Sequence, residues 1–187
     1  MIKYVERFAE WIFGTSNSEE PDPERPYEPI WLSRPLAERS QAYLRSFCSE
    51  EDGREGIVYW AGVQKGKGGV VTTLVVPDAD AGPGYVSTTP GENAGVITEI
   101  VDLDLVLLGQ VHSHPPGAGK THSPGDDEMT FSPFEGAVSV VTADYARGEV
   151  PDSWGVHRFV EGRYQKVSYA QADDHLRIVP GDRDRRE

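Results

Sequence analysis

An apolar run that ends in two histidines constrains this chain more than any other feature. Residues 103–111 are mostly apolar, and a run of this length is too short to cross a membrane but typical of a strand buried on both faces. It leads directly into the sequence His-Ser-His-Pro at 112–115. Because side chains two apart on an extended segment share a face, His112 and His114 can present two imidazoles at the end of this strand.

A predicted helix start adds a carboxylate to these histidines. Ser123 stands at a cap position, followed by proline at the first helical position and acids in the first turn. Asp126 in that turn could complete a set of two histidines and one carboxylate, which with a water is the open arrangement of catalytic zinc. Asp127 is the competing ligand, but helix geometry turns it about 100° away, so Asp126 is favoured.

Each part of this pattern also has a simpler explanation. With five histidines in 187 residues, a chance His-x-His pair is expected in roughly one chain in ten of this composition. A serine and an aspartate at a helix start are by themselves an ordinary cap and a favourable dipole charge. Only the combination indicates metal chemistry.

Outside this segment the patterns alternate between helix and strand. The predicted elements are a helix from Ser33 of about four turns, a hairpin of 56–63 and 69–76, a long loop at 77–91, a helix around 94–101, a strand at 137–142, and a hairpin of 154–160 and 163–169. Strands interleaved with helices predict a single α/β domain with a mixed β-sheet flanked by helices.

The ends of the chain differ from this core in composition. Residues 1–14 carry the apolar stripe of a short amphipathic helix, 15–32 form an acidic proline-rich linker, 33–176 form the domain, and 177–187 are a charged tail. A 12-residue helix is marginal alone in water, so we expect it to dock on its own domain, on a second copy as a homodimer, or on a partner.

Composition excludes several classes of protein. Eighteen basic against 31 acidic residues give a net charge of −13, which disfavours nucleic-acid binding. The chain has no apolar run long enough for a membrane helix, and its first residues are unlike the core of a signal peptide. We therefore expect no membrane association and a cytoplasmic location. The single cysteine, Cys48, cannot form an internal disulfide, and without an evident partner histidine it does not indicate a cysteine protease.

The His-Ser-His-Pro run followed by Ser-x-x-Asp resembles the JAMM motif of the JAB/MPN metallopeptidases, which are zinc isopeptidases that cut ubiquitin or ubiquitin-like tails from a lysine amine. That family places a glutamate seven residues before a glycine on the first strand after the first helix, and Glu55 precedes Gly62 at this spacing. The resemblance covers roughly residues 33–175, is strongest to stand-alone bacterial members, and implies the JAB/MPN (cytidine-deaminase-like) fold.

The resemblance implies a role for each site residue. His112, His114 and Asp126 would hold one Zn²⁺ per chain, Glu55 would be the general base, and Ser123 would donate a hydrogen bond to the developing oxyanion. The implied partners are a ubiquitin-like protein or its conjugate as substrate, together with enzymes of a conjugation pathway. A zinc amidohydrolase of small substrates and a non-catalytic MPN-like scaffold are the alternatives.

Some positions leave the assignment open. Other carboxylates compete with Glu55 as the base, namely Glu50, Glu51 and Asp52. Eight residues separate His114 from Ser123 where seven are more usual in the family, and Val58 stands where many members have glycine. His122 directly precedes Ser123 and could line the mouth of the site, but a loop histidine is more often solvated, so we expect a solvated side chain without a direct role.

Overall fold

A computed structural model describes residues 27–48, 53–129 and 134–181. The helix expected within residues 1–14 and most of the acidic linker lie outside the described residues, as do the three acids that compete with Glu55. No helix in the described ranges is long and apolar enough to span a membrane.

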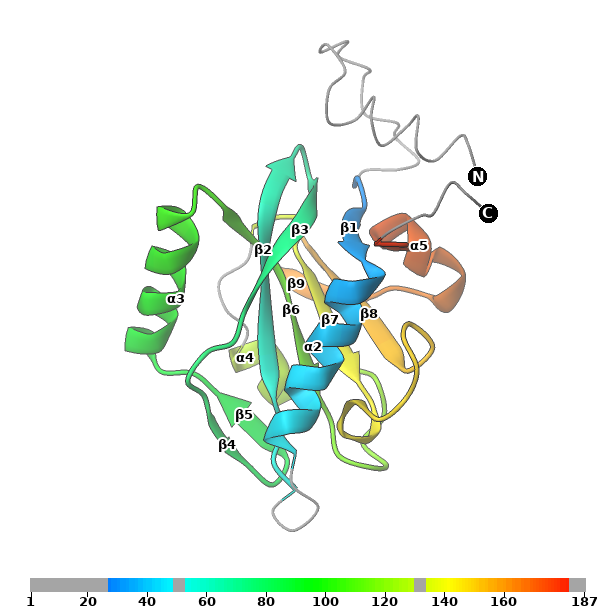
Figure 1. Ribbon diagram of the computed structural model, residues 1–187. Coiled ribbons are helices and arrows are strands. Elements are labelled where there is room, and N and C mark those ends of the chain that lie inside the picture. The colour runs from blue at the N-terminus through cyan, green and yellow to red at the C-terminus, as the bar shows by residue number, and fades with distance from the viewer. Residues whose placement is uncertain (1–26, 49–52, 130–133, 182–187) are drawn as a thin grey trace, which may run out of the picture.

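One mixed sheet organises the described part of the chain (Figure 1). The elements are β1 Ile30–Ser33, α2 Arg34–Phe47, β2 Ile57–Lys65, β3 Gly68–Val75, β4 Asp80–Gly82, β5 Tyr85–Ser87, α3 Pro90–Asp102, β6 Val106–Ser113, α4 Pro124–Met129, β7 Val138–Thr142, β8 Trp154–Val160, β9 Arg163–Lys166, α5 Ala172–His175 and β10 Leu176–Val179. Eight described strands follow the order β10-β1-β3-β2-β6-β7-β8-β9, while β4 and β5 form a separate small sheet. The predicted fold class is confirmed.

Helix α2 covers one face of the sheet and crosses in front of it in Figure 1. Ser33 caps the helix, because its Oγ accepts a hydrogen bond from the Leu36 N–H at 3.4 Å. Its buried side, including Ala37 and Leu44, belongs to the same apolar cluster as Trp60 of β2. The Trp60 indole also donates a hydrogen bond to the helix, so this contact fixes the position of α2 as well as burying apolar surface.

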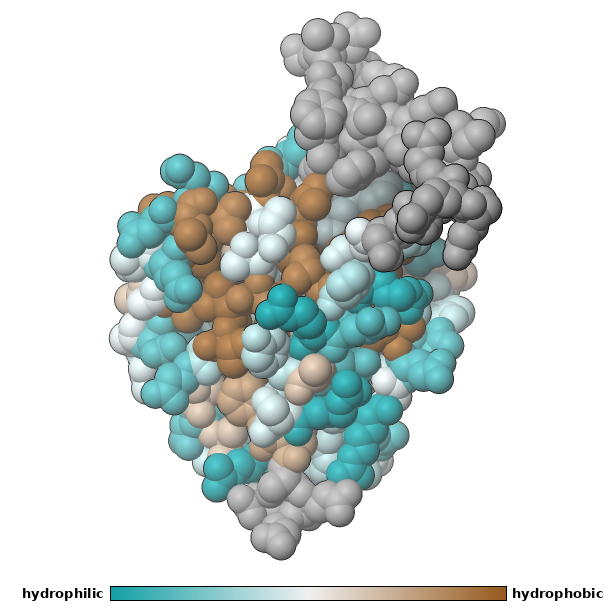
Figure 2. All heavy atoms as spheres, in the orientation of Figure 1, coloured by the Kyte–Doolittle hydropathy of each residue, from teal (hydrophilic) through white to brown (hydrophobic). Residues whose placement is uncertain are grey.

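Helix α3 packs on the opposite face. Val96 and Ile100 cluster with Ile57 and Tyr59, which alternate with the β2 residues facing α2. Apolar residues gather between α3 and α2 over β2 and β3 (Figure 2). Exposed apolar side chains of these elements include Val63, Ile97 and Val101.

Two strands correct the predicted domain boundaries. The sequence predicts a linker at 30–32 and a charged tail at 177–179, but β1 and β10 pair in parallel within the main sheet. Ile30 and Leu32 are fully buried, so the packed domain begins before residue 33 and extends beyond residue 176.

The long loop expected at 77–91 contains the β4–β5 hairpin. An isolated bridge pairs Pro83 at its tip with Arg54, the residue before Glu55. The hairpin therefore lies next to the segment that carries Glu55.

Candidate metal centre

Strand β6 carries His112 and His114 to the end of the sheet. His112 is paired with Ile57 of β2, so it lies on the face covered by α3. The backbone of His114 is held on both sides: its N–H donates to the Thr142 carbonyl at 2.8 Å, and its carbonyl accepts from the Tyr145 N–H at 2.8 Å. Both histidines are about 95% buried.

The side chains of His112, His114 and Asp126 converge on one point. The two histidine Nε2 atoms lie 3.2 Å apart, and the Asp126 carboxylate lies 3.1 Å from His114 Nε2 and 3.5 Å from His112 Nε2. Two ligand atoms bound to one zinc at about 2.0–2.1 Å in tetrahedral geometry are about 3.3 Å apart. The three donors are therefore spaced as a metal ion requires, and a tetrahedral ion held by these three ligands has a fourth position for water or substrate.

The electrostatics of the group favour bound positive charge. Burial raises the pKa of Asp126, but hydrogen bonds with His112, His114 and the Ser123 N–H outweigh burial and leave this pKa far below its usual range. Burial lowers the pKa of His114, whereas the hydrogen bond and charge of Asp126 and the charge of Glu55 raise it, with a net increase. The carboxylate is thus ionised and ready to act as a ligand at neutral pH.

Glu55 lies two residues before β2, beside this group. The segment is fixed by Ser113, the residue between the two histidines, because Ser113 Oγ accepts from the Gly56 N–H at 2.9 Å and the Ser113 N–H donates to the Gly56 carbonyl. Glu55 is only 4% exposed, and burial raises its pKa to about 7, with the Asp126 charge raising and the His114 charge lowering it. A carboxyl with this pKa can gain and lose a proton near neutral pH.

Ser123 caps α4 at the exposed edge of the site. Its Oγ accepts from the Asp126 N–H at 3.2 Å, and its own N–H donates to Asp126 Oδ2 at 2.5 Å. Because the hydroxyl is an acceptor in the cap, its hydrogen remains available to donate to a substrate atom. The structure thus places Ser123 beside Asp126, as the sequence pattern predicted.

His122 is the residue that the sequence interpretation placed wrongly. Its side chain is only 4% exposed, not solvated, and its ring stacks on His157 with centroids 4.1 Å apart. Burial lowers the pKa of His122, and burial followed by the charge of His122 lowers that of His157 to about 4. Polar residues within otherwise apolar strands, such as Gln110 and Ser139, were the available signal for a polar cluster here.

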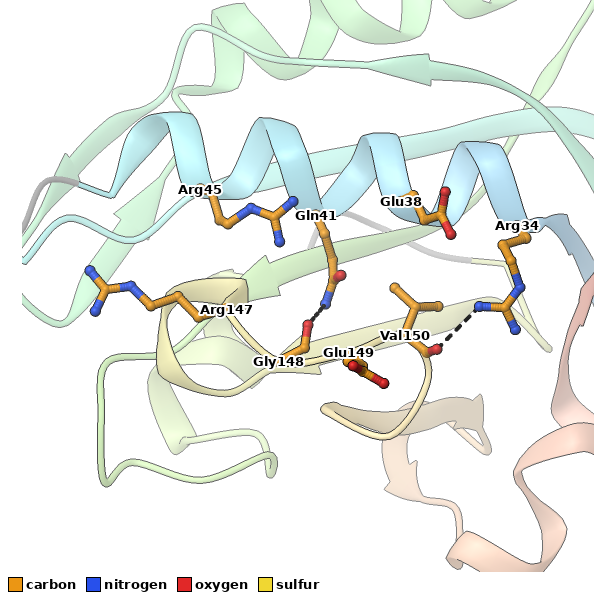
Figure 3. Close-up of a pocket in the computed structure, with 8 residues that line it drawn as sticks. All are labelled: Arg34, Glu38, Gln41, Arg45, Arg147, Gly148, Glu149 and Val150. Atoms are coloured by element: carbon orange, nitrogen blue, oxygen red, sulfur yellow. Dashed lines mark hydrogen bonds between the residues drawn. The ribbon is translucent and has the colours of Figure 1, made fainter.

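A cleft of about 370 Å³ lies away from this centre, between α2 and the loop before β8 (Figure 3). Arg34 donates to the Val150 carbonyl at 3.3 Å, and Gln41 donates to the Gly148 carbonyl at 3.1 Å. These side chains hold the loop against α2. The cleft contains none of the converging metal-site residues.

No protein-family model matches the sequence. A curated protein of Sinorhizobium fredii named probable metalloprotease y4jG is 32% identical over 122 residues, covering 63% of this chain and 73% of the relative.

Solved structures share the fold at low sequence identity. A protein from Desulfitobacterium hafniense superposes with a TM-score of 0.58 and 17% identity, covering 81% of this chain and 93% of its own. A protein from Salinibacter ruber gives a TM-score of 0.51 and 14% identity, covering 82% and 92%.

The similarity to a protein named probable metalloprotease and the JAMM-type arrangement of histidines, serine and aspartate lead to one conclusion. The chain belongs to the JAB/MPN family of JAMM-type metalloproteases.

Proposed function

We propose that this protein is a zinc-dependent peptidase or isopeptidase that cleaves the amide bond after the C-terminal tail of a ubiquitin-like protein. One observation carries the reaction type: the buried carboxyl of Glu55 lies beside three converging metal donors, His112, His114 and Asp126. A scaffold has no physical need for an open metal site next to a buried base.

Zinc fits this donor set. Two imidazoles and one carboxylate are a known ligand set of catalytic zinc, and the spacing of 3.1–3.5 Å between donor atoms fits its tetrahedral bonds. When bound, zinc lowers the pKa of water to about 7 and polarises a carbonyl group.

The chain's own residues supply the remaining chemistry. Glu55 takes a proton from the attacking water and returns it to the leaving amine, a transfer that typically contributes about 10²–10⁴-fold. Ser123 donates its hydroxyl hydrogen to the oxygen on which negative charge develops, and removal of such a donor costs about 3–4 kcal/mol.

The substrate class rests on the family resemblance and on the β4–β5 hairpin. The bridge between Pro83 and Arg54 supports a position of this hairpin beside Glu55. An extended tail could add to its backbone as a further strand, so that main-chain hydrogen bonds supply affinity and small pockets supply specificity.

Two variants and a metal analysis test the proposal. Protein purified without added metal should contain about one zinc per chain and should cleave a ubiquitin-like fusion. Glu55→Gln should keep the zinc but lose at least about 100-fold in kcat, whereas His114→Ala should lose both. Glu99→Gln, at an exposed position of α3, is the matched control and should behave as wild type.

The outcomes separate the alternatives. Less than about 0.2 zinc per chain after reconstitution would reject the metal site. Near-normal turnover by Glu55→Gln would move the base to another carboxylate. Cleavage of small amides without cleavage of any ubiquitin-like fusion would favour the amidohydrolase alternative.

A further inference from the structure

A row of polar residues crosses the sheet beside the metal centre. Gln110 of β6 is paired with Ser139 of β7, and Ser139 is paired with His157 of β8. Paired residues share a face, and Gln110 lies two residues before His112, so the row faces the same side as the metal donors. These residues are at most 5% exposed, in a region where apolar side chains are the usual choice.

The loop that precedes Ser123 rests on this polar row. The His122 N–H donates to His157 Nε2 at 3.3 Å. A Cβ atom at Gly155 would lie 1.8 Å from the Lys120 carbonyl oxygen, so the loop backbone is in direct contact with β8. Only glycine at this position allows so close an approach.

His122 is the centre of a hydrogen-bonded chain between the loop, the sheet and α4. Its Nδ1 is 2.9 Å from Asp127 Oδ1, and its Nε2 is 2.8 Å from Ser139 Oγ. Gln110 Nε2 in turn donates to Ser139 Oγ at 3.4 Å. These hydrogen bonds connect Ser139, which is fully buried, to Asp127, whose side chain is 55% exposed.

The first turn of α4 is consequently attached at two adjacent acids. Asp126 contacts the metal histidines, whereas Asp127 contacts His122. Because neighbouring helix residues point about 100° apart, two such contacts fix the rotation of the helix start as well as its position. Ser123, the cap of this turn, is fixed with it.

We infer that His122 is a positioning residue: held between Asp127 and Ser139, it sets the place of the Ser123 hydroxyl relative to the metal centre. The effect on catalysis rests on the proposed function, in which the Ser123 hydroxyl donates a hydrogen bond to the developing oxyanion. An aspartate, a histidine and a serine in this order also suggest a hydrolytic triad, but the full burial of Ser139 keeps substrate from its hydroxyl.

The hydrogen bonds determine which ring nitrogen of His122 carries the proton. A carboxylate can only accept, so Nδ1 donates to Asp127. Gln110 Nε2 is a donor to Ser139 Oγ, so the Ser139 hydroxyl hydrogen is donated to His122 Nε2, which therefore carries no hydrogen of its own. Ser139 Oγ can then accept from Gln110, which leaves every member of the chain satisfied. His122 is therefore a neutral imidazole protonated on Nδ1.

Ring nitrogen-15 shifts of the zinc-loaded full-length protein test this tautomer directly, with or without a known substrate. We expect the Nδ1–H form for His122 at pH 7 and its loss in Asp127→Ala. Asp127→Asn should retain it, because the amide oxygen can still accept. The Nε2–H form, or a ring that does not respond to Asp127→Ala, would overturn the inference.

Kinetics on a cleavable fusion separate positioning from simple destabilisation. Asp127→Ala should lower kcat about tenfold with little change in KM or zinc content, and Asp127→Asn should restore most of the activity. Combined with Ser123→Ala, Asp127→Ala should cause no further loss, because both act through the same hydroxyl. A role through Ser123 would be contradicted if the double variant lost kcat by the product of the two single losses. Equal losses of kcat in Asp127→Ala and Asp127→Asn would contradict it as well.

Failure of this inference and failure of the proposed function give different results. A wild-type protein that cleaves no amide substrate rejects the proposed function, while the tautomer of His122 still decides the hydrogen-bonded chain. An active wild type whose variants show independent losses keeps the peptidase and removes the positioning role.

Discussion

The burial that makes Glu55 a usable base also makes its ionised form destabilise the folded protein. Burial raises its pKa from 4.5 to about 7, so the ionised form is disfavoured in the folded state. The penalty is absent well below pH 4.5, where Glu55 is protonated in both states, and grows as the pH rises towards 7. Above pH 7 it reaches up to about 3 kcal/mol.

Glu55→Gln should therefore stabilise the metal-free protein in a pH-dependent manner. The gain in free energy of unfolding over wild type should be small at pH 4 and largest at pH 8. Urea unfolding at several pH values measures it, with the exposed Glu99→Gln as control. A gain that is the same at pH 4 and pH 8 would show that Glu55 is not destabilised by ionisation.

Tyr145 links the segment that carries His114 to the segment that carries Glu55. Its N–H holds the His114 carbonyl, and its hydroxyl donates to the Gly53 carbonyl, two residues before Glu55, at 3.1 Å. Residues 144–146 all have left-handed φ angles between 51° and 60°, an unfavourable conformation for side chains other than glycine. The tertiary contacts must hold this turn in place.

Tyr145→Phe removes only the hydroxyl bond to Gly53. We expect a loss of about 1 kcal/mol in stability and a several-fold decrease in kcat, with unchanged zinc content. Tyr169→Phe is the matched control, since Tyr169 is 78% exposed. If Tyr145→Phe loses stability without losing kcat, the hydroxyl supports the fold and not the placement of Glu55.

The residues of the metal centre were predictable because they are local in sequence. His112, His114, Ser123 and Asp126 fall within one short segment, where strand and helix periods already determine which side chains share a face. The environment of His122 was not predictable in this way. Its partners come from separate strands, whose register only the folded sheet defines.

At the scale of elements, β1 and β10 show why short strands escape detection. Each has four residues, too few for an alternating pattern to stand out from flanking prolines and charges. Their pairing joins the two ends of the described chain. The buried Arg158 adds support from β8, because its guanidinium donates to the carbonyls of His175 and Glu28.

The β4–β5 hairpin is the element expected to select the substrate. Replacing residues 80–87 with a short Gly-Ser linker should raise KM for a ubiquitin-like fusion by at least about tenfold, because the backbone edge for an extended tail is lost. KM for a small peptide and the zinc content should change little. Equal kinetics before and after the replacement would remove the hairpin from the substrate path.

At the scale of the whole molecule, the metal centre depends on a sheet in which the first and last described strands lie together at one edge. β1 pairs with β10 on one side and with β3 on the other. Loss of β1 would therefore expose the edge of β3 and leave β10 without its partner. Ile30 and Leu32 alone would return about 3–6 kcal/mol of buried apolar side chain to water, a large share of the 5–15 kcal/mol that typically stabilises a domain.

Two truncations locate the boundary between the extension and the catalytic domain. Deleting residues 1–26 should leave zinc content and cleavage of a small peptide intact, because the first described strand begins at Ile30. Deleting residues 1–33 should abolish cooperative unfolding and zinc binding, because it removes β1. Calorimetry and metal analysis distinguish these results, and light scattering of the shorter deletion tests whether the amphipathic segment at 2–13 mediates self-association.

Loss of zinc on deleting 1–26 would show that the extension is part of the catalytic fold, whereas retention of a stable, zinc-loaded protein without residues 1–33 would show that β1 is dispensable to the sheet.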